Sequence, residues 1–295
     1  MRGIRFKQRI MIISIGFAFF ALCIIGGYSI ILPAFVCLIY GLIEPYCIER
    51  KETYFYSDKI PKSFENFKIV FVSDIHHGIV YSGKRLKTLV NQVNALQPDL
   101  ILLGGDYIDQ HKYIPSCFDK LKGLCAGYGV YGVLGNHDYC AGSEAVREAM
   151  HKAGIICLDN CFVYVKKDND KIQVGGIGDY WNDPQNLSAF LEDIKADDFV
   201  MLLSHNPDYV EKIRTNKVDL VLSGHTHGGQ VTFFGLWAPF IPSGFGQKYR
   251  TGLIETPYTK VLVTNGIGNV GCIPIRFFAR PQINIIYLKN NSVDD

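Results

Sequence analysis

Five short apolar runs in this chain are each followed by polar side chains that bind metal ions, and this pattern constrains the fold more than any other. The runs are residues 67–72, 100–103, 130–134, 199–203 and 218–222. Their length and branched aliphatic composition are typical of buried β-strands. The polar residues that follow them, in the same order, are Asp74 and His76, Asp106, Asn136–His137–Asp138, His205, and His225 and His227.

The segments between these runs predict an α/β fold. Apolar residues recur at helical spacing in residues 84–96 and 116–124, and Ser143 is a suitable cap for a further helix that ends at His151. Two more helices are predicted at 187–194 and 209–214. Strands that alternate with helices form parallel βαβ units, and short strands at 155–158, 162–166 and 172–177 add mixed pairing. Further strands are predicted at 231–234, 260–264 and 283–288.

The polar clusters predict a metal centre. Ligands of open α/β sheets bind beyond the carboxyl ends of the strands, where all five clusters lie. Six of the eight histidines lie in or directly beside the clusters. Carboxylate, amide and imidazole donors without thiolate suit Mn, Fe, Zn or Co better than a structural zinc site. Seven such donors exceed the needs of one ion but suffice for two that share a carboxylate, an arrangement that activates water for phosphoester hydrolysis.

In these blocks the sequence resembles the calcineurin-like metallophosphoesterases. The matching motifs are Asp74-Ile-His76, Gly105-Asp106, Gly135-Asn136-His137-Asp138, Ser204-His205 and Gly224-His225-Thr226-His227, in the family's order across residues 65–290. The resemblance implies a sandwich of two mixed β-sheets flanked by helices. It also implies two divalent ions, with manganese favoured, that share Asp106. One ion would take the further ligands Asp74, His76 and His227, and the other Asn136, His205 and His225. His137 would contact the phosphate and assist the leaving group, oriented by Asp138.

Within the family, the sequence is similar to a membrane-anchored bacterial branch. The similarity lies in residues 74–78, 224–230 and 245–252 and in the Glu-Pro pair at 44–45. It implies hydrolysis of a phosphodiester or diphosphate at a membrane surface by a metal-activated hydroxide. One candidate is cleavage of UDP-2,3-diacylglucosamine to a lipid sugar 1-phosphate and UMP. The alternatives are a broad-specificity phosphodiesterase or phosphatase acting on cell-envelope or nucleotide substrates, and a metal-bound membrane scaffold. The intact His137 argues against the scaffold.

The N-terminal region predicts a membrane anchor. Residues 10–43 carry no charged side chain, a run too long for one straight crossing of a bilayer and short for two. Gly26, Gly27 and Pro33 interrupt it, which favours two short hydrophobic helices at about 10–31 and 34–47. We therefore expect an anchor in residues 1–50 and a catalytic domain in residues 51–295, with the lipid bilayer as a partner.

Charge and cysteine content indicate the side of the membrane. Four basic residues within the first nine place the N-terminus in the cytoplasm, and a helical hairpin would return the catalytic domain there. A single crossing would export it instead. Six cysteines, at 117, 125, 140, 157, 161 and 272, lack the spacing of a disulfide framework, which favours a reducing compartment. We therefore expect the domain on the cytoplasmic face of the cell membrane.

Residues outside the predicted metal centre give little indication of partners. The net charge is +2, and no basic stripe marks a nucleic-acid groove, so we expect no nucleic acid as a partner. The expected substrate is a phosphorylated small molecule or lipid, and the oligomeric state is not indicated. Lys248 and Arg250 would either bind a diphosphate or belong to a structural turn. Trp237, Phe240 and Phe245 would form a lid or reach acyl chains, or else form a small apolar cluster of their own.

Overall fold

The computed structural model describes residues 28–187, 191–192, 194–271 and 274–292, and the chain divides into two compact units, Met1–Ile43 and Glu44–Asp295. In the first unit, helix α2 (Tyr28–Ile43) contains Pro33. The predicted helix at 10–31 lies outside the described residues except for its last four positions. Within the described ranges, no helix has the length and hydropathy needed to cross a bilayer. The membrane anchor therefore stays a prediction.

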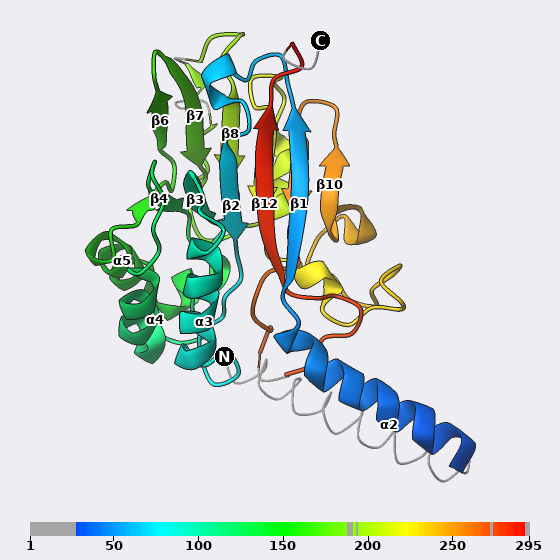
Figure 1. The fold of residues 1–295 in the computed structure, drawn as a ribbon. Coiled ribbons are helices and arrows are strands. Elements are labelled where there is room, and N and C mark those ends of the chain that lie inside the picture. The colour runs from blue at the N-terminus through cyan, green and yellow to red at the C-terminus, as the bar shows by residue number, and fades with distance from the viewer. Residues whose placement is uncertain (1–27, 188–190, 193, 272–273, 293–295) are drawn as a thin grey trace. The chain divides into compact units, whose positions relative to one another are not determined.

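The first sheet of the second unit is six-stranded and mixed (Figure 1). Its strands, in spatial order, are β1 (Glu49–Tyr56), β12 (Gln282–Lys289), β2 (Lys68–Val72), β3 (Leu100–Leu103), β4 (Val130–Gly132) and β5 (Ile156–Cys157). Only β12 and β2 pair in antiparallel fashion, whereas every other pair is parallel. The parallel strands β2, β3 and β4 therefore end at the same edge.

The second sheet is also six-stranded and mixed. Its order is β10 (Gly252–Glu255), β11 (Lys260–Val263), β9 (Leu220–Ser223), β8 (Val200–Leu203), β7 (Asp170–Gly176) and β6 (Phe162–Lys167). The outermost pair on each side is antiparallel and the three inner pairs are parallel. The prediction of an α/β fold with two mixed sheets is confirmed.

The alternation of apolar side chains along each strand explains why the sheets pack as layers. On β2, Ile69 and Phe71 belong to a buried cluster that also contains Met201 and Leu203 of β8, so this cluster lies between the two sheets. The intervening residues of β2 and β3 pack instead under the helices, since successive strand side chains point to opposite faces. The interior of the domain therefore has a layer between the sheets and a further layer outside each sheet.

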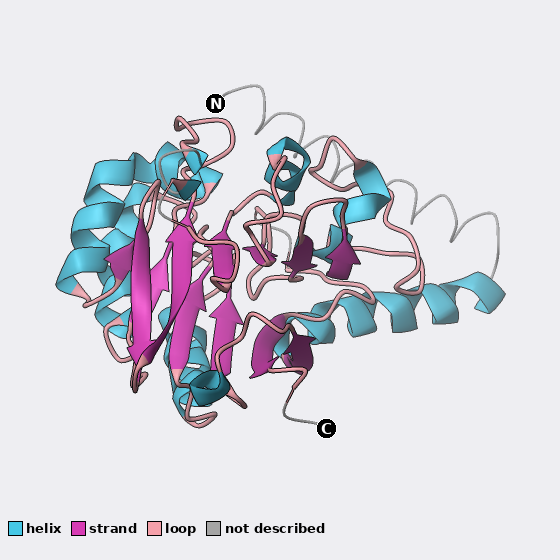
Figure 2. Cartoon of the chain, turned by 90° about the horizontal axis from the view of Figure 1, so that it is seen from above, coloured by secondary structure: helices cyan, strands magenta, loops and turns pink. Residues whose placement is uncertain are grey.

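Helices cover the outer faces of the sandwich. Helices α3 (Gly83–Asn94), α4 (Ile114–Leu121) and α5 (Asn136–Lys152) pack on the first sheet (Figures 1 and 2). The short 3₁₀ helix η4 (Pro207–Lys212) packs on the second. The remaining 3₁₀ turns are η1 (Glu44–Tyr46), η2 (Lys62–Phe64), η3 (His111–Tyr113), η5 (His227–Gly229) and η6 (Gly246–Tyr249).

Two local predictions were wrong, and a third was incomplete. Helix α5 consists of two helical segments that meet at Gly142, whose φ of 121° is not helical. The second segment begins at Ser143 as expected, whereas the first, from Asn136, was not predicted. The helix expected at 209–214 is the 3₁₀ helix η4. Residues 231–234 form isolated bridges rather than a strand, because Gly235 at a φ of 73° turns the chain back at once. The helix expected at 187–194 lies partly outside the described residues.

Candidate metal centre

The ends of strands from both sheets bring the predicted ligands together. The backbone N–H of His225, beyond β9, donates to Oδ1 of Asp74, beyond β2, at 2.9 Å. Nδ1 of His205, beyond β8, lies 2.7 Å from the carbonyl oxygen of Gly104, beyond β3. These bonds join loops of one sheet to loops of the other. The centre therefore lies where the carboxyl ends of the parallel strands of both sheets meet.

The backbone at the centre is strained. Five of the seven predicted ligands have a positive φ, between 47° and 69°, namely Asp74, His76, Asp106, His225 and His227. This region is uncommon for residues other than glycine and costs of order 1–3 kcal/mol for each residue. Such strain persists only where the surrounding structure enforces it, and it clusters at functional sites. The concentration of five such residues among the predicted ligands agrees with a functional site in these loops.

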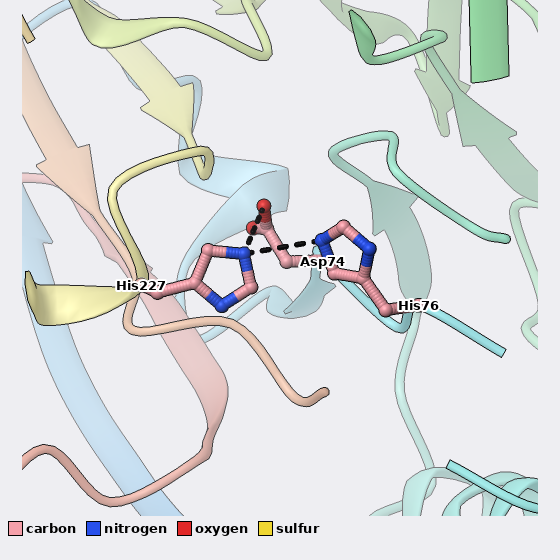
Figure 3. Close-up of side chains that lie close together, drawn as sticks. All are labelled: Asp74, His76 and His227. Atoms are coloured by element: carbon pink, nitrogen blue, oxygen red, sulfur yellow. Dashed lines mark hydrogen bonds and ion pairs between the residues drawn. The ribbon is translucent and has the colours of Figure 1, made fainter. Parts of the chain in front are cut away.

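The first group of predicted ligands contains Asp74, His76 and His227 (Figure 3). The Nε2 atoms of the two imidazoles face each other at 3.1 Å. Nε2 of His227 lies 3.4 Å from Oδ1 of Asp74, and Nε2 of His76 lies 3.5 Å from Oδ2 of Asp106. Two ring nitrogens and two carboxylates thus converge on one point.

The second group contains Asp106, His205 and His225. Nε2 of His205 lies 3.2 Å from Oδ2 of Asp106 and 3.3 Å from Nδ1 of His225. Asn136 follows β4 at the start of α5, and its buried Oδ1 has no hydrogen-bond partner within the described part of the chain. Asp106 lies within 3.5 Å of an imidazole from each group and therefore stands between the two.

Burial and neighbouring carboxylates shift the pKa values of the four histidines in opposite directions within each group. Burial lowers the pKa of His225 to about 3 and that of His227 to about 4. Burial acts in the same direction on His76 and His205, but neighbouring carboxylates outweigh it and raise the pKa of both, to about 10 for His205. Each facing pair therefore combines one imidazole whose charged form is favoured by carboxylates with one whose neutral form is favoured by burial.

These observations fit two divalent cations. A cation between the two ring nitrogens of a pair would let both imidazoles act as neutral ligands, and Asp106 would contact both ions. The buried Oδ1 of Asn136, which has no hydrogen-bond partner among the described residues, would be available as the amide donor expected for the second group. The donor set contains carboxylate, amide and imidazole groups and no thiolate, as the sequence indicated.

Further side chains hold the ligands in place. Nδ1 of His76 lies 2.9 Å from Oδ1 of Asp109, a bond that orients the ring so that Nε2 faces the centre. The fully buried Arg276 lies behind His227, with one guanidinium nitrogen 3.3 Å from Nδ1 of that ring. The sequence carried no signal for Arg276, which lies in an apolar stretch far along the chain.

His137 and Asp138 have different surroundings. The half-buried His137 donates its backbone N–H to Oδ1 of Asp106 at 2.8 Å, and its ring lies edge-on to that of His76 with the centroids 4.7 Å apart. The carboxylate of the buried Asp138 instead accepts backbone N–H groups of Gly135, Asp106 and Tyr107 at 2.7–2.9 Å. No hydrogen bond among the described residues joins it to the ring of His137. Asp138 therefore positions the loop of Asp106.

Lys248, Arg250 and Trp181 lie outside the set of predicted ligands. Lys248 pairs with Glu211, and Arg250 donates to the carbonyl oxygen of Gly235 at 2.7 Å, so both belong to the structural turn. The sequence analysis did not single out Trp181. Its ring centroid lies 4.9 Å from that of His225, and 55% of its surface is exposed. The indole is therefore available to a substrate beside the metal centre.

Comparison with known proteins assigns the fold and the centre to a family. Residues 67–229, which include all seven predicted ligand positions, match the family described as calcineurin-like phosphoesterase. The chain belongs to the calcineurin-like phosphoesterase family. Members of this family typically bind a dinuclear divalent metal site, which agrees with the two groups of side chains described above.

Relatives of this phosphoesterase include bacterial proteins of similar length. The uncharacterized metallophosphoesterase YkuE of Bacillus subtilis is 32% identical over 257 residues, covering 85% of this chain and 88% of the relative. Phosphodiesterase YaeI of Escherichia coli is 32% identical over 235 residues, covering 75% and 82%. The solved NAD nucleotidase of Haemophilus influenzae superposes with a TM-score of 0.47 and 16% identity, over 68% of this chain and half of that one. By its family, the chain is a metal-dependent phosphoester hydrolase.

Proposed function

We propose that this phosphoesterase cleaves a phosphodiester or diphosphate bond at a membrane surface, with two divalent metal ions. The observation that carries the proposal is the position of Asp106 between two pairs of facing imidazoles. Asp74, His76 and His227 would hold one ion, Asn136, His205 and His225 the other, and Asp106 both. When bound, the ions would supply Lewis acidity that lowers the pKa of a water molecule and neutralises charge developing on the phosphate.

In this proposal, His137 assists the departure of the leaving group. Its backbone is fixed by the carboxylate of Asp106, and its ring stands beside His76 while remaining half exposed. An imidazole so placed reaches a phosphate held at the centre and donates a hydrogen bond to the departing oxygen. The Asp138 carboxylate keeps Asp106 in place through three backbone hydrogen bonds and takes no direct part.

For the substrate, we propose a lipid diphosphate of the UDP-2,3-diacylglucosamine type. Water would attack one phosphorus of the diphosphate, and the products would be a lipid sugar 1-phosphate and UMP. Two features support this choice. Residues 10–43 carry no charge and would hold the enzyme at a bilayer, and the exposed indole of Trp181 beside His225 offers a stacking surface for a base. The alternative, a phosphodiesterase with broad specificity, is supported by the likeness to the Escherichia coli phosphodiesterase.

The test compares substrates on the full chain in detergent micelles with added manganese. We expect metal-dependent hydrolysis of bis-p-nitrophenyl phosphate, and faster release of UMP from UDP-2,3-diacylglucosamine, identified by mass spectrometry. Asp106→Asn is the matched control, because it keeps the size of the side chain and removes the shared charge. Hydrolysis of neither substrate with any first-row divalent metal would overturn the proposal. A rate on the lipid no higher than on the soluble diester would favour the broad-specificity alternative.

For localisation, we propose that residues 1–50 anchor the enzyme and that the catalytic domain faces the cytoplasm. The four basic residues within the first nine, and the six cysteines of the domain that lack the spacing of a disulfide framework, support this orientation. Reporter fusions at the C-terminus test it. Fluorescence of a cytoplasmic reporter is expected, and activity of a periplasmic phosphatase reporter at the same position would reverse the assignment.

A further inference from the structure

An exposed apolar surface lies on the loop that follows His227, drawn in gold in Figure 1. Its five members, called here the aromatic ridge, are Phe233, Phe234, Leu236, Trp237 and Phe240. All are more than half exposed, and Leu236 and Phe240 reach 80% and 74%. Single exposed apolar residues are ordinary on soluble proteins, but a contiguous group marks an interaction surface.

The ridge is built on a hydrogen-bonded turn. The N–H of Phe233 donates to the carbonyl oxygen of Trp237 at 2.6 Å, and the N–H of Leu236 donates to that of Phe233 at 3.0 Å. The N–H of Gly235 donates to Oγ1 of Thr232 at 2.9 Å. Because the backbone of the turn is satisfied internally, its exposed side chains are a feature of the fold and do not result from a loose loop.

The ridge shares its support with the metal centre. The guanidinium of Arg250 donates to the carbonyl oxygen of Gly235, within the ridge, at 2.7 Å. The same group donates at 3.4 Å to the carbonyl oxygen of Gly228, the residue after His227. One side chain thus ties the turn of the ridge to the loop of a predicted metal ligand. A surface that binds the ridge is therefore held close to the centre.

The chain enters the catalytic domain beside the ridge. Both carboxylate oxygens of the buried Glu44 accept backbone N–H groups, those of Phe278 and Ala279, each at 2.7 Å. The ring of Phe278 packs against that of Phe234, with centroids 5.3 Å apart. Glu44 is also the first residue after the uncharged segment 10–43. Glu44, which follows the apolar segment in the sequence, is therefore fixed at the base of the ridge.

We propose that the aromatic ridge inserts into the interface of a phospholipid bilayer and holds the metal centre against the lipid surface. A segment of 34 uncharged residues, 10–43, requires an apolar environment, and a bilayer that holds it begins within a few residues of Glu44. Phe, Leu and Trp side chains are those that enter the headgroup and acyl boundary. This inference rests on the proposed function in taking the bilayer as the site of action, and it names the surface that meets the bilayer.

The two tryptophans of the chain make a direct test possible. The Trp181→Phe variant of the full chain retains Trp237 as the only tryptophan. It is reconstituted into phosphatidylethanolamine–phosphatidylglycerol vesicles, with and without lipids brominated near the top of the acyl chain. Insertion predicts a loss of Trp237 emission with brominated lipid and a blue shift of the emission. Unchanged Trp237 emission overturns the proposal. If light scattering in detergent then shows a dimer, a second copy of the chain covers the ridge instead of lipid.

A matched variant separates the ridge from the anchor. In the Trp181→Phe background, the double substitution Leu236→Ser and Phe240→Ser should remove the quenching, while residues 10–43 keep the protein in the vesicle fraction. Persistent quenching in this variant would assign the effect to the anchor alone and overturn the proposal. Because the readout needs no turnover, it is independent of the proposed function: an inactive protein with a quenched Trp237 would refute the enzyme and retain the ridge.

Activity gives the second readout. The same double substitution should leave hydrolysis of bis-p-nitrophenyl phosphate unchanged, because neither side chain belongs to the metal centre. The rate of hydrolysis of the lipid substrate in vesicles should fall by roughly tenfold relative to the rate for the soluble diester, because two large apolar side chains are no longer present to be buried in the bilayer. An unchanged ratio of the two rates would contradict insertion during catalysis.

Discussion

Gly135, the residue before Asn136, offers a sharp test of the metal centre because it lies against the proposed bridging ligand. A Cβ added at Gly135 would lie 2.8 Å from Cγ of Asp106 and 2.7 Å from its backbone nitrogen. Its φ of −104° is accessible to alanine, so Gly135→Ala adds a clash without backbone strain. The substitution leaves every predicted ligand in the sequence and changes only where Asp106 can lie.

The size of the effect follows from these distances. Non-bonded carbon atoms separate by about 3.5 Å or more, so Asp106 Cγ must move by about 0.7 Å. A misplacement of about 1 Å at a catalytic group costs roughly a hundredfold in rate, or about 2.7 kcal/mol. We therefore expect kcat/KM for bis-p-nitrophenyl phosphate to fall by about two orders of magnitude, with weaker binding of manganese. Overpacking should destabilise the fold by only about 1–3 kcal/mol.

The assay is a manganese titration of hydrolysis, with thermal unfolding measured to confirm that the variant is folded. Gly127→Ala is the matched control, since an added Cβ there meets no atom within 4 Å. It should keep the parent's rate and metal affinity. If folded Gly135→Ala hydrolysed the diester as fast as Gly127→Ala at the same manganese concentration, Asp106 could not be the shared ligand, and the reasoning would fail.

Three further predictions follow from the same geometry. Asp109→Asn weakens the hydrogen bond that orients the His76 ring and should lower the affinity for manganese about 10–100-fold, measured by isothermal titration calorimetry. An unchanged affinity would show that Asp109 does not orient His76. Arg276→Met leaves the buried carbonyl oxygens of several residues without their donor, so the free energy of unfolding measured in urea should fall by about 3 kcal/mol. The exposed Arg280→Met is the control and should change it by less than ~0.5 kcal/mol. Equal urea midpoints for the two variants would refute this role of Arg276. Removal of metal with a chelator should lower Tm. Manganese at a hundred times its Kd should raise the free energy of unfolding by about 2.7 kcal/mol, which corresponds to roughly 5–10 °C in Tm. A Tm that does not respond to metal would count against metal ions bound to these side chains.

The parts of the fold that the sequence predicted are those with a strong local pattern. The strand at 100–103 matches β3 at both ends, because four aliphatic residues lie between Asp99 and Gly104. The predicted ligands also come together, since each follows a strand and the strand ends of both sheets meet at one edge. Local spacing therefore sufficed for β3 and for the residues that approach one another at the centre.

The missed features depend on contacts between distant segments. The second segment of α5 begins at Ser143 as predicted, but the first was missed because it depends on the hydrogen bonds of Asp138 with Gly135 and the loop of Asp106. The same bonds explain why Asp138 does not reach the ring of His137. Arg276 is held by carbonyl groups from several loops, and no spacing in the sequence records such a set of acceptors.

The pairing of β1 with β12 places the two ends of the catalytic domain side by side. β1 is an edge strand, and among the described strands its neighbour in the sheet is β12. On the ribosome, β1 therefore emerges early and waits for β12, a delay of roughly 10 to 45 s at about 5–20 residues per second. If the predicted anchor is real, that interval would let the segment before β1 reach a membrane while the first sheet is still open.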